Sequence, residues 1–277
     1  VSSRLKERVP PQDFPFLLSA QPAMFDMEEL EEQDPEGGHV EAAPASQPSR
    51  KPRVACLHGG AGNGHIFRTQ LKQLVARLGS DVELHFLEGG LLTDEVRFDE
   101  RGKKNAKMIR TFFGEDQVLR EHAITRYGEK GESGPYYYDR LEEGVANLEA
   151  KLRALPAPVD ALLGFSQGAN FSTMLCARAI QGLDGAAPPF RCVVLLENDR
   201  PGWPEQKPEL FTEPLPVPVL LVAGQEDSEA QDMASKLFTT VSRTNHTDGH
   251  RPLPKDPQRC THVVELVRSF LLEHCRP

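Results

Sequence analysis

The chain has 277 residues, of which 39% are hydrophobic, 26% charged and 7% aromatic, and it carries a net charge of −9. This composition predicts a globular protein of one large or two small domains. The acidic balance argues against a nucleic-acid-binding protein, and no run approaches the ~18 apolar residues that a membrane-spanning helix needs. Five scattered cysteines without Cys-x-x-Cys spacing argue against a disulfide framework and favour a reducing compartment, for which we expect the cytoplasm.

Residues 1–51 form an acidic N-terminal extension. Ten acidic and four basic residues lie within residues 1–50, and a stretch rich in Pro, Ala, Ser and Gly follows the acidic run. Such a segment cannot bury enough apolar surface to offset its ordering entropy, so we expect disorder. Its apolar residues between Phe14 and Phe25 could bind an unknown protein partner, although local collapse of the tail is the simpler explanation. Because the chain begins with Val rather than Met, we expect a fragment or a processed product, without a secretory leader.

Residues 52–277 alternate short apolar runs with helical periodicity. The runs at 54–57, 161–163, 192–196 and 217–223 lack polar–apolar alternation, which is typical of strands buried on both faces of a parallel sheet. The run at 82–87 alternates and resembles an edge strand. Apolar stripes within 71–78, 141–152 and 263–271 predict helices. This order predicts an α/β fold with a mostly parallel central sheet and helices on both faces.

The segment from Leu91 to Tyr138 interrupts the alternation. It is long and polar, and aromatic residues gather at its centre and at its end. A long insertion in a compact α/β domain is either a lid or a disordered loop. As a lid, it should line the substrate pocket with its apolar side chains. The residues expected to contact substrate are Phe112, Phe113, Tyr136, Tyr137 and Tyr138.

The most informative motif is Gly-Phe-Ser-Gln-Gly at residues 164–168. An apolar run leads into it and a helical segment follows it. A sharp turn from strand to helix exposes the serine at the carboxyl edge of the sheet, and the glycines leave room for the strained backbone. The helix N-terminus then directs N–H groups at a developing oxyanion. We therefore expect Ser166 to be a nucleophile; a glycine-rich turn with a capping serine is the alternative.

A serine nucleophile needs a base that is itself oriented by an acid, and in chains with this turn the acid and then the histidine follow the serine. Asp227 comes just after the apolar run 217–223 and is the preferred acid. Glu226 and Asp232 remain possible, and an N-cap for the next helix would also explain Asp227. His250 follows a glycine in the loop before the last helix and is the preferred base.

His246 and His250 are four residues apart, a spacing that could suggest a metal site. Gly249 and Pro252 argue against a helix there, and no Glu follows His246 as the H-E-x-x-H motif requires. We therefore expect no metal at these histidines.

The oxyanion hole should take one N–H from Gln167, the residue after the nucleophile, and one from the loop that follows the first strand. This loop is glycine-rich, and Gly60 is the preferred donor, with Gly59 and Ala61 as alternatives. The loop lacks the Gly-Lys-Ser/Thr of a phosphate-binding loop and the spacing of a dinucleotide fingerprint. It therefore predicts no nucleotide cofactor.

Four stretches together resemble the FSH family of serine hydrolases, a branch of the α/β-hydrolases. They are 57–64 (Leu-His-Gly-Gly-Ala-Gly-Asn-Gly), 159–169, 219–227 and 246–252, within a resemblance that covers residues 52–274. The resemblance implies an α/β-hydrolase fold, a triad of Ser166, Asp227 and His250, and carboxylesterase or thioesterase activity without a cofactor. Two departures bear on substrate choice: Gly60 stands where a larger residue is usual, and residues 91–138 lack a Trp-rich run.

These observations predict a serine hydrolase that cleaves small-molecule acyl esters through an acyl-enzyme intermediate. An acyl thioesterase and an acyltransferase are alternatives that use the same groups. A ligand-binding α/β-hydrolase without activity is a third alternative, although a receptor would have no need of the base.

Overall fold

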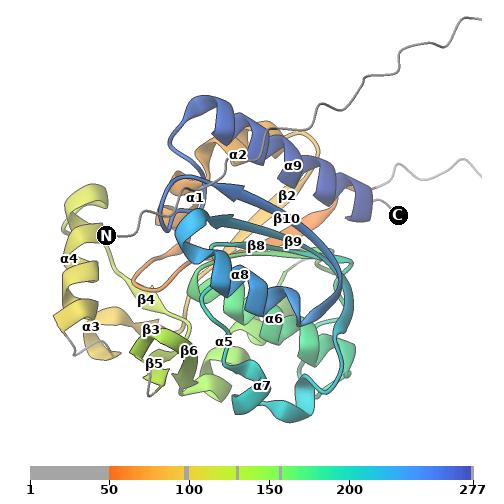
Figure 1. Ribbon diagram of the computed structural model, residues 1–277, viewed down its shortest axis with the longest axis horizontal. Helices are drawn as coiled ribbons and strands as arrows, with labels where there is room; N and C mark the ends of the chain where they lie inside the picture. Colours follow the sequence, from red (N-terminus) through yellow and green to blue (C-terminus); the bar gives the residue numbers. More distant parts are fainter. Residues whose placement is uncertain (1–49, 97–99, 129–130, 156–157, 276–277) are drawn as a thin grey trace, which may run out of the picture. The chain divides into compact units, whose positions relative to one another are not determined.

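The computed structural model describes residues 50–96, 100–128, 131–155 and 158–275. The expected disorder and docking patch of the N-terminal extension lie outside these residues. The core of the described part is a six-stranded sheet in the order β10-β9-β8-β7-β1-β2, with every neighbouring pair parallel (Figure 1). Its strands are β1 (Arg53–Leu57), β2 (Glu83–Leu87), β7 (Ala161–Phe165), β8 (Cys192–Leu196), β9 (Leu215–Gly224) and β10 (Phe238–His246).

The sheet confirms the five strands expected from the apolar runs. The four runs without alternation became β1, β7, β8 and β9 in the interior of the sheet, and β2 lies at an edge as its alternation indicated. The sequence analysis missed β10, which forms the opposite edge. Most of its side chains are exposed or half-buried, so its sequence carries no continuous apolar run.

Helices cover both faces of the sheet, as Figure 1 shows. Because successive strand residues point to opposite faces, Val54 and Cys56 of β1 pack in one apolar cluster, whereas Ala55 and Leu57 pack in another. Helices α1 (Gly64–Gln70), α2 (Lys72–Leu78) and α9 (Pro257–Cys275) contribute to the first cluster. The second cluster contains residues of α5 (Leu141–Arg153), α6 (Gln167–Ile180), α7 (Trp203–Gln206) and α8 (Ser228–Ser235). The three helices expected from the apolar stripes are therefore confirmed as α2, α5 and α9.

The described part of the insertion at 91–138 has secondary structure of its own. Its elements are β3 (Leu91–Leu92), α3 (Thr93–Val96), α4 (Glu100–Phe113), β4 (Arg120–Glu121), β5 (Ile124–Gly128) and β6 (Gly131–Asp139). The strands form two small antiparallel pairs, β3–β4 and β5–β6. A backbone bridge joins Arg120 to Gly62, so the insertion is anchored beside the loop after β1.

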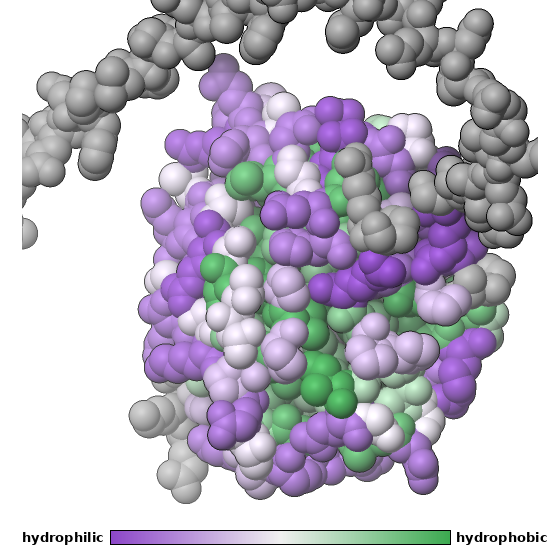
Figure 2. All heavy atoms as spheres, turned by 90° about the vertical axis from the view of Figure 1, so that its right-hand side faces the viewer, coloured by the Kyte–Doolittle hydropathy of each residue, from purple (hydrophilic) through white to green (hydrophobic). Residues whose placement is uncertain are grey.

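The surface is of mixed polarity. On the face in Figure 2, hydrophilic side chains surround small areas of hydrophobic ones, as is usual for a globular domain. Within the described ranges, no helix has both the length and the apolar character needed to cross a bilayer.

Candidate active site

The turn between β7 and α6 places Ser166 at the carboxyl edge of the sheet. Ser166 has φ 53° and ψ −120°, a conformation that costs energy in residues other than glycine. The two flanking glycines are required by close packing. A Cβ on Gly164 would lie 2.3 Å from the carbonyl oxygen of Gly168, and a Cβ on Gly168 would lie 2.2 Å from the carbonyl oxygen of Leu57. The motif therefore permits a strained turn that is packed against β1.

Asp227 and His250 meet at the same edge of the sheet. Asp227 ends the short 3₁₀ helix η2 (Gln225–Asp227), which follows β9 directly. Its Oδ2 accepts a hydrogen bond from Nδ1 of His250 at 3.1 Å. The His250 ring lies against Phe165, the residue before Ser166, with 5.3 Å between ring centroids. Asp227 and His250, which are far apart in sequence, thus meet beside the turn that carries Ser166.

The alternatives for the acid differ in their surroundings. Asp227 occupies the N-cap position of α8, but its side chain makes no capping hydrogen bond, so the capping explanation does not account for it. Asp232 is exposed on α8 and forms an ion pair with Arg243. The side chain of Glu226 lies outside the described residues.

Electrostatics favour a basic imidazole next to an ionised carboxylate. Burial lowers the pKa of His250, but the hydrogen bond to Asp227 and the nearby carboxylates outweigh it, so the pKa is raised above 6.5. The hydrogen bond from His250 lowers the pKa of Asp227, burial opposes this shift, and the neighbouring Glu197 acts in the same direction as His250. The pair can therefore accept a proton on the imidazole while the carboxylate stays charged.

The glycine-rich loop after β1 lies against Ser166, since a Cβ on Gly59 would come 3.2 Å from the Ser166 Cβ. His58 orients this loop: its Nδ1–H donates to the Gly59 carbonyl at 2.7 Å, and its Nε2 accepts the Gly89 N–H at 2.9 Å. Because the peptide group is planar and trans, fixing this carbonyl also fixes the opposite direction of the Gly60 N–H. The Ala61 N–H instead donates to the buried Glu121 carboxylate at 2.8 Å.

The Gln167 side chain joins the turn to the insertion. Its Oε1 accepts the backbone N–H of His122 at 2.7 Å, and its Nε2 donates to the Ala123 carbonyl and to the Thr125 hydroxyl, each at 3.0 Å. The His122 ring in turn stacks on His58 with 4.5 Å between centroids. Sequence analysis assigned only the backbone of Gln167 and missed this network, because residues that meet only in the folded chain leave no local pattern.

The five aromatic residues expected to contact substrate do not gather in one place. Phe112 is 76% exposed on α4, whereas Phe113 packs with Ala61 and its neighbours. Tyr138 is buried in the main core, and Tyr136 packs against the same core. Tyr137 is half-buried, and its hydroxyl donates to Glu205. Of the five residues, Phe113 is the one that packs against the apolar cluster containing Ala61, a residue of the loop that carries Gly60.

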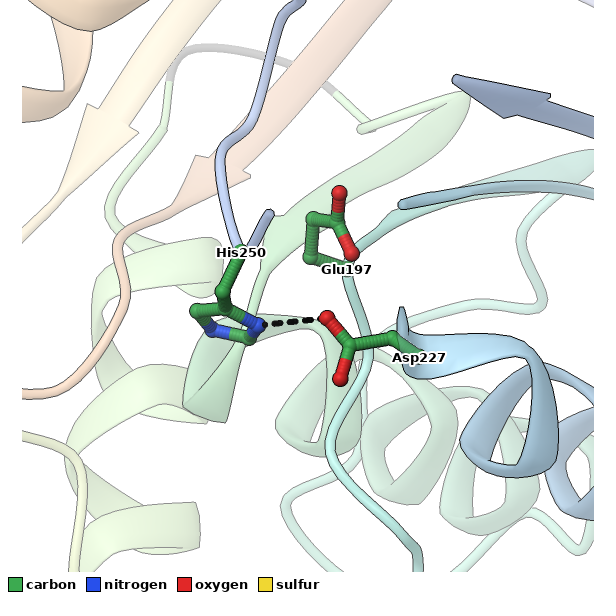
Figure 3. Close-up of side chains that lie close together, drawn as sticks. All are labelled: Glu197, Asp227 and His250. Carbon is green, nitrogen blue, oxygen red and sulfur yellow. Dashed lines mark hydrogen bonds and ion pairs between the residues drawn. The ribbon is translucent and has the colours of Figure 1, made fainter. Parts of the chain in front are cut away.

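A second carboxyl group lies beside Asp227 and was missed by the sequence analysis. Glu197 comes directly after β8, is fully buried, and its Oε1 accepts the Gly224 N–H at 2.7 Å. His246 Nε2 lies 2.9 Å from the same oxygen, so the second histidine belongs to this buried pair. Figure 3 shows Glu197 close to the Asp227–His250 pair. The signal that selected Asp227, a carboxylate just past a buried strand, also applied to Glu197.

Glu197, Asp227 and His250 are also close enough to be considered as metal ligands. Among the described residues they form a group whose potential ligand atoms lie within 4.8 Å of one another. However, the His250 nitrogen and an Asp227 oxygen are already bonded to each other, and Glu197 Oε1 already accepts the Gly224 N–H. The arrangement fits proton transfer better than metal coordination.

Residues 47–259 match the family model described as "Serine hydrolase (FSH1)". The chain belongs to the FSH1 serine hydrolase family. It is 28% identical to the esterase OVCA2 of Danio rerio over 205 residues, which covers 72% of this chain and 88% of that protein. The human esterase OVCA2 is 33% identical over 43% of this chain and 53% of its own length. A dihydrofolate reductase of Schizosaccharomyces pombe is 26% identical over 80% of this chain.

The chain spans about half the length of the fission-yeast and human relatives, namely 47% and 53%. Among solved structures, acyl-protein thioesterase 2 of Zea mays superposes with a TM-score of 0.50 at 19% identity, covering 81% of this chain and 96% of that one. At this identity the likeness shows the shared α/β-hydrolase fold. The FSH1 match and the esterase relatives support an esterase-type hydrolase.

Proposed function

We propose that this FSH1 protein hydrolyses carboxylic esters of small molecules through an acyl-enzyme intermediate on Ser166. The observation that carries the proposal is the hydrogen bond between Asp227 and His250, which lie at the same sheet edge as a strained serine turn. A structural turn would need neither the strained serine nor a basic imidazole beside it. The esterase relatives agree with this chemistry.

The proposed reaction has two symmetrical halves. Ser166 Oγ attacks the ester carbonyl carbon while Nε2 of His250 takes the hydroxyl proton. The imidazolium then gives this proton to the leaving alcohol as the C–O bond breaks, leaving the acyl group on Ser166. Water repeats the sequence: it gives a proton to His250 as it attacks the acyl carbon, and the imidazolium then returns that proton to Ser166 Oγ as the bond to the acyl group breaks and the carboxylic acid leaves. Since Nδ1 of His250 bonds Asp227, the tautomer with its proton on Nδ1 is favoured, which leaves Nε2 able to accept a proton.

The oxyanion is assigned to the backbone N–H groups of Gln167 and Gly60. Gln167 is the first residue of α6, where N–H groups lack intrahelical partners. Gly60 is favoured over Ala61 because the Ala61 N–H is engaged by Glu121, and His58 fixes the peptide that carries the Gly60 N–H. His58 can donate through Nδ1 and accept through Nε2 only while it is neutral, and burial favours this form because it lowers the pKa of His58.

The insertion is proposed to supply the lid and the acyl pocket. It is anchored through Arg120 to the glycine-rich loop after β1, here called the oxyanion loop (residues 58–63), and through Gln167 to the turn that carries Ser166. Phe113 packs in the cluster that contains Ala61, so its side chain can extend an apolar wall from the oxyanion loop. An apolar wall beside the reacting carbonyl favours acyl chains longer than acetyl.

Thioesters and acyl transfer would use the same serine and histidine, and the maize protein of similar fold is named a thioesterase. Parallel assays of one acyl group on an oxygen ester, a thioester and an alcohol acceptor separate these alternatives. The reductase name of the fission-yeast relative is not carried over, because the match leaves more than half of that protein uncovered. We further propose a reducing compartment such as the cytoplasm, since the five cysteines are free and buried.

Labelling with a fluorophosphonate tests the proposal directly. The probe should modify wild-type protein once, on Ser166, and Ser166→Ala should lose both labelling and ester hydrolysis. Ser172 is the matched control serine and should not be labelled, because it is buried in α6 and its hydroxyl donates to the Gly168 carbonyl. A label on Ser172, or activity of the Ser166→Ala variant within tenfold of wild type, would reject the mechanism.

A further inference from the structure

Glu197 and its surroundings form a buried group that the reaction above does not use. Glu197 is fully buried, and its backbone has φ 46°. Among the described residues, four that are not glycine have positive φ: Ala61, Arg140, Ser166 and Glu197. Three of these belong to the loops around the nucleophile. Strain of this kind persists where the surrounding structure requires it, often at functional sites.

The polar contacts of Glu197 are unequal. Oε1 accepts the Gly224 N–H and lies near His246 Nε2, whereas no described group donates to the buried Oε2. A buried carboxylate oxygen without a donor is costly, but a protonated carboxyl group can use its own O–H as a donor. In Figure 3 the Glu197 carboxyl points toward the Asp227 oxygen that contacts His250.

The environments of the two carboxyl groups determine which of them carries a proton. Burial raises the pKa of Glu197, and the neighbouring Asp227 carboxyl group raises it further, although His246 and the Gly224 N–H act in the opposite sense. Asp227 is half-buried and bonded to His250, which lowers its pKa. When two carboxyl groups share a site, the more buried one keeps the proton.

We propose that Glu197 is a positioning residue: as a neutral carboxyl group it donates a hydrogen bond to the Asp227 carboxylate and holds that carboxylate toward His250. The inference rests on the proposed function, because it assigns Glu197 a role through Asp227. Neither Ser166 nor the substrate is contacted by Glu197 in this role. The Gly224 N–H holds the other oxygen, Oε1, and the buried His246 lies beside that oxygen.

The test uses variants that keep or remove the donor. Glu197→Ala should lower kcat about tenfold with little change in KM, and Glu197→Gln, whose amide N–H can still donate to Asp227, should restore most of the loss. In an Asp227→Asn background, Glu197→Ala should change kcat less than about twofold, because groups that act as a unit are not additive. Glu149→Ala, which removes another buried glutamate paired with Arg178, is the matched control and should leave kcat unchanged.

The outcomes separate this role from the others. If Glu197→Gln is as damaging as Glu197→Ala, an ionised Glu197 beside His246 is required and the proposal is wrong. If Glu197→Ala lowers kcat by the same factor in the wild-type and the Asp227→Asn backgrounds, the role of Glu197 is merely structural. If Asp227→Asn itself leaves activity intact, the proposed function fails instead. Should Glu197→Ala not fold, Glu197→Asp withdraws the carboxyl by one methylene and should show the same loss of kcat and the same dependence on Asp227.

A separate observation concerns the outer face of α4. Within the described residues, the large hydrophobic side chains that are exposed are Met108, Phe112 and Val118, all on α4 or the loop after it. Lys104, Met108 and Phe112 share one face at i, i+4 and i+8, with exposed Lys103 and Lys107 on the adjacent row. The helix carries five basic residues and one acidic residue in a chain of net charge −9.

The geometry points to an anionic lipid surface as the partner of this face, which we define as Lys103, Lys104, Lys107, Met108 and Phe112. Exposed aromatic and aliphatic residues flanked by lysines suit insertion at a headgroup boundary that attracts cations. The inner side of α4 packs through Ala106 against Ala61 of the oxyanion loop, so docking would bring the site to the lipid that holds acyl substrates.

Vesicle co-sedimentation of the full chain tests this surface. Binding is expected to vesicles of phosphatidylcholine and phosphatidylserine at about three to one, with loss in pure phosphatidylcholine and at high salt. Met108→Ser with Phe112→Ser, and separately Lys103→Glu with Lys107→Glu, should each reduce bound protein at least about fivefold. Lys72→Glu on α2 is the matched charge control. Equal binding to both kinds of vesicle, or no binding to either, would overturn the proposal. So would a dimer of the wild-type chain that the Met108→Ser, Phe112→Ser double variant converts to a monomer.

Discussion

At the scale of residues, the site is a set of side chains whose ionisation is controlled by their neighbours. His250 is 42% exposed, whereas the second histidine, His246, is almost fully buried against Glu197. The two differ in their surroundings: His250 is hydrogen-bonded to Asp227, whereas His246 ends β10 beside Glu197. The exposed imidazole of His250 can be reached by substrate and by water, as a general base must be.

The pH dependence of kcat/KM should report this environment. The base must be neutral, so activity should rise with pH through a midpoint above the usual 6.5 of histidine, since the pKa of His250 is raised. Asp227→Asn removes the charge and should move the midpoint to lower pH while cutting turnover about 10³-fold or more. Asp232→Asn, on α8, is the control. A wild-type midpoint below 6.5, or one that Asp227→Asn leaves in place, would contradict the assignment.

At the scale of elements, the turn that carries Ser166 depends on the close approach of α6 to β1. Gly168→Ala would put a Cβ 2.2 Å from the Leu57 carbonyl oxygen and 2.5 Å from that of His58. We expect a loss of about 1–3 kcal/mol in unfolding free energy, and loss of fluorophosphonate labelling because the turn must shift. Urea denaturation and labelling measure the two effects. Gly79→Ala is the control: its added Cβ would have its nearest contact at 3.3 Å, so it should lose neither stability nor labelling. A Gly168→Ala variant that is stable and still labelled would contradict this packing argument.

The insertion is the element that should set acyl-chain preference. If Phe113 extends an apolar wall from the oxyanion loop, each buried methylene adds up to ~0.8 kcal/mol of binding. Turnover of p-nitrophenyl esters should therefore rise from acetyl toward the octanoyl range, and Phe113→Ala should flatten the series. Fastest hydrolysis of the acetyl ester, with no effect of Phe113→Ala, would show that the insertion does not form the pocket.

At the scale of the whole molecule, the hydrolase part begins before the first strand. Arg50 donates to both oxygens of the buried Asp160 at 2.6 and 2.8 Å, and the Arg53 N–H donates to the same carboxylate. Removing residues 1–48 should therefore leave turnover and Tm nearly unchanged. Removal that extends through Arg50 should lower Tm by a few degrees, because Arg50 is 44% exposed and its pair contributes up to about 1 kcal/mol.

Calorimetry and turnover of the two truncated chains check this boundary. An inactive but folded chain lacking residues 1–48 would show that the N-terminal segment takes part in activity. Equal Tm values for both truncations would show that Arg191, 3.7 Å from Asp160, is a sufficient partner.

Local sequence patterns were enough to predict the layered fold and the candidates for the triad. Continuous apolar runs indicate strands buried on both faces, and the positions just after such strands lie at one sheet edge, which places Ser166 and Asp227 at the same edge. Local patterns predict strands and helices because the burial of an element is reflected in the order of its apolar and polar residues. The mostly exposed β10 left no such pattern.

The surroundings of these residues could be learned only from the folded chain. It paired His250 with Asp227, buried His246 against Glu197, and divided the aromatic residues of the insertion between the core and the solvent. These contacts join residues from different elements, and their energies depend on distance and burial rather than on neighbours in sequence. The same rule that selected Asp227 applied to Glu197, but only its packing beside Asp227 showed that the two carboxyl groups share a site.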